Sequence, residues 1–94
     1  MAKIDPIEVG EEIRTIRHDI QWAGKFGSKE ELTKKYDISV ATLKSVEMGY
    51  ERPDSEAFIS VARMIFQASR DYAVELTPGF VKYLKWARRQ EIDI

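Results

Sequence analysis

Residues 28–53, with the sequence SKEELTKKYDISVATLKSVEMGYERP, constrain the fold of this chain more than any other segment. Ser28 and Ser39 each precede a short helix-compatible run, and serine in that position caps a helix by accepting a hydrogen bond from a backbone amide. Asp37 lies between the two runs, where aspartate tolerates the left-handed backbone of a tight turn. Gly49 follows the second run as a typical helix-ending residue. The segment therefore predicts two short helices joined by a sharp turn.

The two predicted helices cover residues 28–36 and 39–48. Glu31 follows Ser28 by three residues, as in a capping box, which strengthens the first of them. Four apolar side chains are able to lock the pair together: Leu32, Ile38, Leu43 and Val46.

A longer helix is predicted at the start of the chain. Asp5 is its expected N-cap and Pro6 its first helical residue. Its apolar face repeats at helical spacing: Val9, Ile13, Ile16 and Ile20. Residues 21–27 contain two glycines and break the pattern, so we expect Trp22 and Phe26 to fill the core beneath a loop.

Further helices are predicted after residue 53. Asp54 or Ser55 caps one of them, whose apolar face contains Phe58, Val61, Ala62 and Ile65. Residues 67–76 are expected to add a helical turn or two. Thr77 followed by proline then marks the start of a last helix over residues 78–90.

Composition excludes several classes of protein. The chain has 94 residues, 44% of them hydrophobic and 33% charged, which is typical of one globular domain. It has no cysteine and a single histidine, His18, so neither a disulfide nor a zinc site is expected. No apolar run approaches the roughly 20 residues of a bilayer-spanning helix. We expect a cytoplasmic protein without metal or cofactor, and the absence of a phosphate-binding glycine loop or paired nucleophile predicts no enzyme activity.

Net charge does not decide whether the chain binds nucleic acid. The formal charge is -1, from 15 basic and 16 acidic side chains. Binding would depend on where the lysines and arginines lie, since a local basic surface is what attracts a polyanion.

The central segment contains a motif defined by the order and the separations of its residues: Ser28, Leu32, Ser39, Thr42, Leu43, Glu47, Gly49 and Pro53. Further residues extend the pattern on both sides: Gly10, Ile13, Arg14, Ile16, Arg17, Phe58, Val61, Ala62 and Ile65. Residues 9–66 thereby resemble the phage repressor and Cro-type helix-turn-helix family, often called XRE-like. Three features depart from the family: a longer interval between Arg17 and Ser28, Thr33 in place of a small alanine, and Asp37 in place of the turn glycine.

The resemblance implies an all-α fold, a five-helix lambda-repressor-like DNA-binding domain with an additional C-terminal helix. The domain would cover residues 1–66, with its motif at 28–48. Residues 67–94 would form a helical extension that packs on the domain or dimerises. The family consists of prokaryotic and phage transcription regulators, so the resemblance implies a sequence-specific repressor that reads the DNA major groove with the helix 39–48.

The resemblance also assigns roles to individual residues. The expected base contacts come from Lys29, Val40, Ala41, Lys44 and Ser45. The expected phosphate contacts come from Ser28, Ser39, Thr42, Tyr50 and Arg52. An ion pair between Arg17 and Glu47 is expected to join the first helix to the end of the recognition helix.

Partners other than double-stranded DNA remain open at this point. A homodimer is expected from the family, with an aromatic surface formed by Phe80, Tyr83, Leu84 and Trp86, although these side chains are equally able to pack on their own domain. The nearby cations Lys82, Lys85, Arg88 and Arg89 are an alternative contact to DNA backbone. The competing function is an antitoxin-like or adaptor module that uses the same fold to bind a protein partner such as a toxin.

Overall fold

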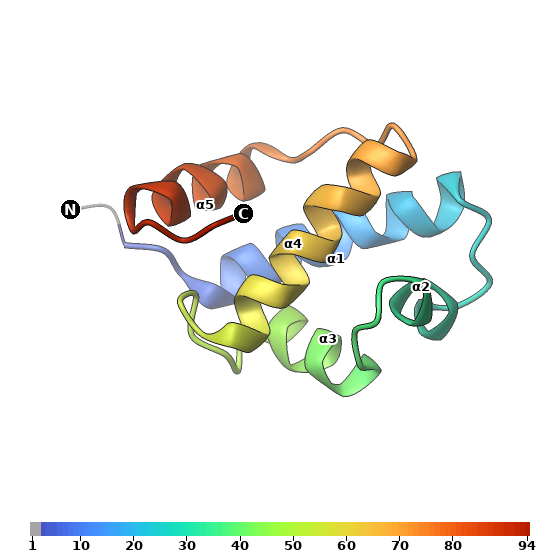
Figure 1. Cartoon of the computed structure of the whole chain (residues 1–94), viewed down its shortest axis with the longest axis horizontal. Helices are drawn as coiled ribbons and strands as arrows, with labels where there is room; N and C mark the ends of the chain where they lie inside the picture. The colour runs from blue at the N-terminus through green and yellow to red at the C-terminus, as the bar shows by residue number, and fades with distance from the viewer. Residues whose placement is uncertain (1–2) are drawn as a thin grey trace.

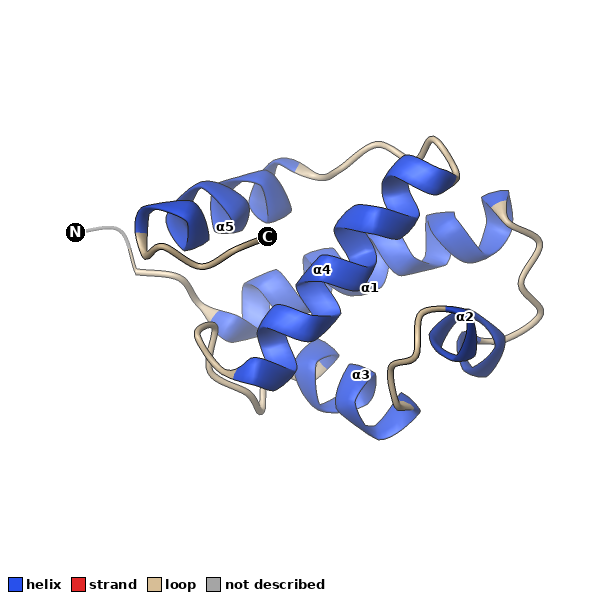
Figure 2. Cartoon of the chain, viewed as in Figure 1, coloured by secondary structure: helices blue, strands red, loops and turns tan. Residues whose placement is uncertain are grey.

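Five α-helices make up the fold in the computed structural model, which describes residues 3–94 and has no strand within them (Figures 1 and 2). They are α1 (Pro6–Ala23), α2 (Lys29–Lys35), α3 (Val40–Glu47), α4 (Glu56–Asp71) and α5 (Pro78–Arg89). None of the helices in this part of the chain combines the length and the apolar composition needed to cross a bilayer.

A polar side chain caps the start of every helix. The caps are Asp5, Ser28, Ser39, Ser55 and Thr77, and each accepts a hydrogen bond from an amide of the first turn. These are the caps expected from the sequence, with Ser55 selected over Asp54. The helix starts are therefore local properties of the sequence, because a cap needs only the residues beside it.

The helices share one hydrophobic core. α1 and α4 lie at its centre, while α3 packs on both of them from one side and α5 packs on α1 from the other (Figure 1). Every helix contributes buried apolar side chains, among them Ile13, Leu32, Leu43, Phe58 and Phe80. The protein measures 40 × 25 × 21 Å, and α3 and α5 lie at opposite edges of it.

The number of helices differs from the expected one. Five helices in all, and not five plus an additional one, are present in residues 3–94, because residues 67–71 continue α4. The buried face of α4 extends through Ala68 and Ser69, so nothing interrupts the helix before Ala73 adopts a φ of 55°. The boundary expected after residue 66 consequently falls inside a helix.

Trp22 corrects a second expectation. α1 continues to Ala23, so Trp22 is helical and is 88% exposed, whereas Phe26 is partly buried against the core. Successive helical residues are rotated by about 100°, which places Trp22 on the side of α1 facing away from Ile20. Trp22 therefore contributes little to the core.

Candidate nucleic-acid interface

The turn between α2 and α3 has the geometry expected at Asp37. Its φ of 57° is left-handed, and the amide of Ile38 donates to the carbonyl oxygen of Thr33 at 3.0 Å. Thr33 is 1% exposed, and its hydroxyl donates within α2 to the carbonyl oxygens of Lys29 and Glu30, at 2.9 and 3.1 Å. The larger residue thus fits between the helices without leaving a buried polar group unsatisfied.

The rear of α3 is held against α1 by close backbone contact. A Cβ atom on Gly10 would lie 2.6 Å from the carbonyl oxygen of Val46 and 2.7 Å from that of Glu47. Gly49 ends α3 with a φ of 78°, and a Cβ there would lie 2.6 Å from Ile7 Cγ1. Gly10 is required because the two helices approach closely there, and Gly49 is required because its backbone is left-handed.

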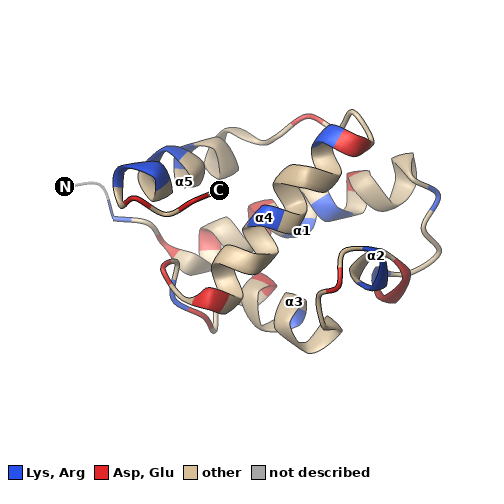
Figure 3. Ribbon diagram, in the orientation of Figure 1, with Lys and Arg blue, Asp and Glu red and all other residues tan. Residues whose placement is uncertain are grey.

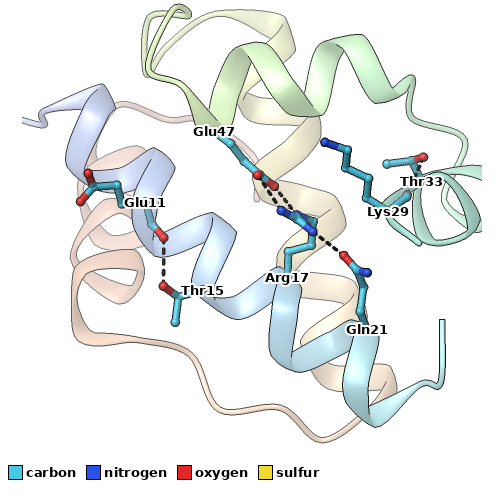
Figure 4. A network of polar contacts seen from close by, with 7 residues as sticks. All are labelled: Glu11, Thr15, Arg17, Gln21, Lys29, Thr33 and Glu47. Carbon is cyan, nitrogen blue, oxygen red and sulfur yellow. Dashed lines mark hydrogen bonds and ion pairs between the residues drawn. The ribbon is translucent and has the colours of Figure 1, made fainter. Parts of the chain in front are cut away.

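A buried polar network strengthens the same junction (Figure 4). Arg17 is 6% exposed, and its Nε and Nη2 donate to the two carboxylate oxygens of Glu47 at 2.5 and 2.9 Å. Its Nη1 donates to the side-chain oxygen of Gln21. Because a two-point arginine–carboxylate pair fixes direction as well as distance, the network orients the C-terminal end of α3 relative to α1.

The leading end of α3 is open to solvent. Ser39, Ala41 and Lys44 are exposed, while Val40 and Ser45 are half-buried. The Lys29 side chain extends from α2 across the gap toward α3 (Figure 4). Of the side chains expected to meet base edges, Ala41 and Lys44 are therefore accessible, and Lys29, Val40 and Ser45 are partly accessible.

The expected phosphate contacts are less uniform. Tyr50 and Arg52 project from the loop after α3, and Tyr50 is 73% exposed. Arg52 forms an exposed ion pair with Asp54 at 3.2 Å, an interaction of small energy.

The hydroxyl groups expected at the phosphates already have partners within the protein. Ser28 Oγ accepts from the amide of Glu31 at 3.3 Å. Ser39 Oγ accepts from the amide of Thr42 at 3.1 Å and shares a hydrogen bond with its hydroxyl at 2.7 Å. Their first role is to cap α2 and α3.

A cluster of aromatic and charged residues fixes the far end of α2 to α4. The Tyr36 hydroxyl donates to the Asp71 carboxylate at 2.6 Å, and this hydrogen bond is the main reason that the pKa of Asp71 is lowered. Desolvation by burial raises the pKa of Tyr36. Lys35 Nζ donates to the Tyr72 hydroxyl at 2.6 Å, and the Tyr72 ring meets Phe26 edge-on. α2 is thus anchored by side chains at its C-terminal end.

The aromatic residues of α5 mostly belong to the core. Phe80 and Tyr83 are fully buried and Leu84 is 3% exposed, so these three pack on their own domain and are not a free surface. Trp86 is half-buried and lies against Tyr83 with ring centroids 5.8 Å apart. Of the four residues considered for dimerisation, only Trp86 is accessible to a partner.

Comparison with known proteins does not identify the chain: no family model, no curated protein and no solved structure matches it. What the structure establishes is the class, an all-α protein whose residues 3–94 form five helices with a tight turn between α2 and α3.

Proposed function

We propose that this protein is a sequence-specific DNA-binding transcriptional regulator, a repressor, that places α3 in the major groove. The main support is the contrast between the two ends of α3. The rear end is fixed by Gly10 and by the Arg17–Glu47 pair, while the leading end is exposed. A rigidly held helix with a free N-terminal end suits a groove about 12 Å wide.

The side chains on the leading end suggest which bases would be read. Val40 and Ala41 cannot donate hydrogen bonds, but they suit the methyl group of thymine. Lys44 is exposed and able to reach the acceptor atoms of guanine. Tyr50 and Arg52 would contact phosphates and set the register of α3 without reading sequence.

Binding as a two-fold dimer is part of the proposal. Repressors with this type of motif bind half-sites about one helical turn apart. Since Phe80, Tyr83 and Leu84 are buried, Trp86 is the member of the expected α5 surface that stays accessible to a second copy.

The proposal is tested by gel-shift titration of the DNA upstream of the protein's own gene at about 50 and about 200 mM salt. We expect specific binding that weakens as salt rises, because phosphate contacts release counterions. The double variant Lys44→Ala, Ser45→Ala should lose the specific complex. Lys34→Ala on α2 removes the same single charge from an exposed position and is the control. Equal affinity of the double variant and the control would refute the assignment of α3 as the reader.

An antitoxin-like or adaptor module is the second candidate. It is favoured by the near balance of 15 basic and 16 acidic residues and by the apolar pair Val40 and Ala41 on the leading turn. A neighbouring gene whose small product copurifies with this protein, together with no binding to the upstream DNA, would select this function over the first.

A further inference from the structure

The charges of α5 are distributed very unevenly. The helix holds four of the 15 basic residues of the chain and none of the 16 acidic ones. All four lie in exposed positions: Lys82, Lys85, Arg88 and Arg89. The small net charge of the whole protein therefore conceals a cationic helix (Figure 3).

Two arginines of α4 extend this cationic surface. Arg63 and Arg70 are exposed, and Phe66 lies between them in sequence. The guanidinium carbons of Arg70 and Arg88 lie 5.8 and 5.9 Å from the centroid of the Phe66 ring, so two helices direct cations at one aromatic side chain. Such contacts restrain the guanidinium groups. We call Arg63, Arg70, Lys85, Arg88 and Arg89 the α5 basic face.

No cation of the α5 basic face forms a close ion pair within residues 3–94. The structure records two ion pairs among residues 3–94, and neither involves this face. Arg63 Nε donates to the main-chain oxygen of Asp93 at 2.7 Å, a neutral acceptor. The carboxylates of Glu91 and Asp93 are exposed in the following segment. Cations in the last turn of α5 interact favourably with the helix dipole, which accounts for Arg88 and Arg89. The dipole does not account for Lys85, nor for Arg63 and Arg70 on α4.

The chemistry of the face favours a polyanion over a protein partner. Protein interfaces concentrate apolar and aromatic area at a core depleted of charge, whereas the Phe66 ring lies beneath two guanidinium groups. Lys85 and Arg89 are four residues apart, which is about 6 Å along a helix. Each DNA strand carries one phosphate per about 3.4 Å of helix axis, so two cations about 6 Å apart are able to meet phosphates of one duplex.

The position of the face separates it from the proposed reading helix. α5 lies at the opposite edge of the molecule from α3, with α1 and α4 between them (Figure 1). A duplex seated on α3 would leave the α5 basic face open. We propose that this face binds the phosphate backbone of a second DNA duplex without reading its sequence, so that one molecule bridges two duplexes. The bridging rests on the proposed function, whereas the backbone binding does not.

The backbone binding is tested first, by fluorescence anisotropy with a duplex of arbitrary sequence. The test variant is Lys85→Ala, Arg89→Ala, and the matched control is Lys3→Ala, Arg14→Ala, which removes two exposed cations elsewhere. We expect the test variant to bind several-fold more weakly and to lose about 2 from the slope of log affinity against log salt, since each phosphate contact contributes about 0.9. The control should retain the affinity and the slope of the original protein.

Two results would overturn this assignment. One is an affinity and salt slope that are the same in the test variant and the original protein. The other is binding of poly-glutamate, lost in the test variant, without binding of the duplex; that would identify an acidic protein as the partner.

Bridging is tested with two duplexes that carry different fluorophores, one containing the upstream DNA and one of arbitrary sequence. We expect energy transfer between them with the original protein and none with Lys85→Ala, Arg89→Ala. If Lys44→Ala, Ser45→Ala abolishes energy transfer yet still binds the arbitrary duplex, both surfaces act as proposed. Loss of all duplex binding in that variant would show that α5 does not bind DNA by itself.

Discussion

Tyr83 and Pro53 are joined by a hydrogen bond across 30 residues of sequence: the Tyr83 hydroxyl donates to the main-chain oxygen of Pro53 at 3.0 Å. Pro53 belongs to the loop that follows α3, and Tyr83 is fully buried on α5. Burial also raises the pKa of the Tyr83 hydroxyl, so it keeps its proton to higher pH than an exposed tyrosine does. α5 is thereby attached to the loop that carries Tyr50 and Arg52.

Tyr83→Phe removes this hydrogen bond while keeping the aromatic ring. We expect the free energy of unfolding to fall by about 1–2 kcal/mol, because the oxygen of Pro53 loses its partner in a partly buried place. Urea denaturation measures the change. Tyr50→Phe is the control, since its ring is exposed, and it should shift stability by less than about 0.5 kcal/mol. Equal stability of the two variants would contradict a stabilising role for the bond.

Gly10→Ala should destabilise the protein even though alanine favours helix by about 1 kcal/mol over glycine. The new methyl group would lie 2.6 Å from the Val46 carbonyl oxygen, so α1 and α3 would have to separate, at a net cost of about 1–3 kcal/mol. Gly27→Ala is the matched control, because its nearest neighbour would be a Glu31 side-chain oxygen at 3.4 Å. Thermal unfolding that ranks the two variants in the reverse order would argue against close α1–α3 contact.

Arg17→Met should lower stability by about 3–5 kcal/mol, because it leaves the Glu47 carboxylate largely buried without its partner. Adding Glu47→Leu should recover part of that loss, since the double variant buries no charge. A double-mutant cycle measured by chemical denaturation isolates the coupling between the two residues. Purely additive effects would mean that Arg17 and Glu47 do not interact in solution.

Asp71→Asn should reduce the sensitivity of the protein to acid. The hydrogen bond from Tyr36, then that from Gln67, lowers the pKa of Asp71 in the folded state. Its stabilising contribution is therefore complete above the unfolded pKa of about 3.9 and is lost as pH falls through the lower folded value. We expect the variant to lose less stability than the original protein between about pH 7 and about pH 2. Asp19→Asn, at an exposed position on α1, is the control; an identical acid response in both variants would refute the prediction.

The helix boundaries that the sequence predicts well are those set by local chemistry. The five caps, the left-handed Asp37 and the helix-ending Gly49 all appear where their side chains or backbone preferences place them. Each depends on a few consecutive residues, so the printed sequence contains the necessary information.

The parts that the sequence predicts poorly depend on tertiary contacts. Whether residues 21–23 continue α1 decides whether Trp22 points to the core or to solvent, and no local signal settles that choice. The same holds for residues 67–71, which remain helical because Ala68 and Ser69 pack on the core. The contact of Arg88 with the Phe66 ring is likewise invisible before the positions of α4 and α5 in the fold are known.

The division of α3 into an anchored rear and a free front has a consequence for how this protein can change. Substitutions at Ala41 or Lys44 alter exposed atoms that support no other part of the fold, so they should leave its stability nearly intact. Substitutions at the anchored rear should instead lower stability, as predicted above for Gly10 and Arg17. If α3 reads DNA as proposed, a lineage carrying this scaffold is able to acquire new base preferences through the exposed side chains of one helix while the rest of the molecule stays as it is.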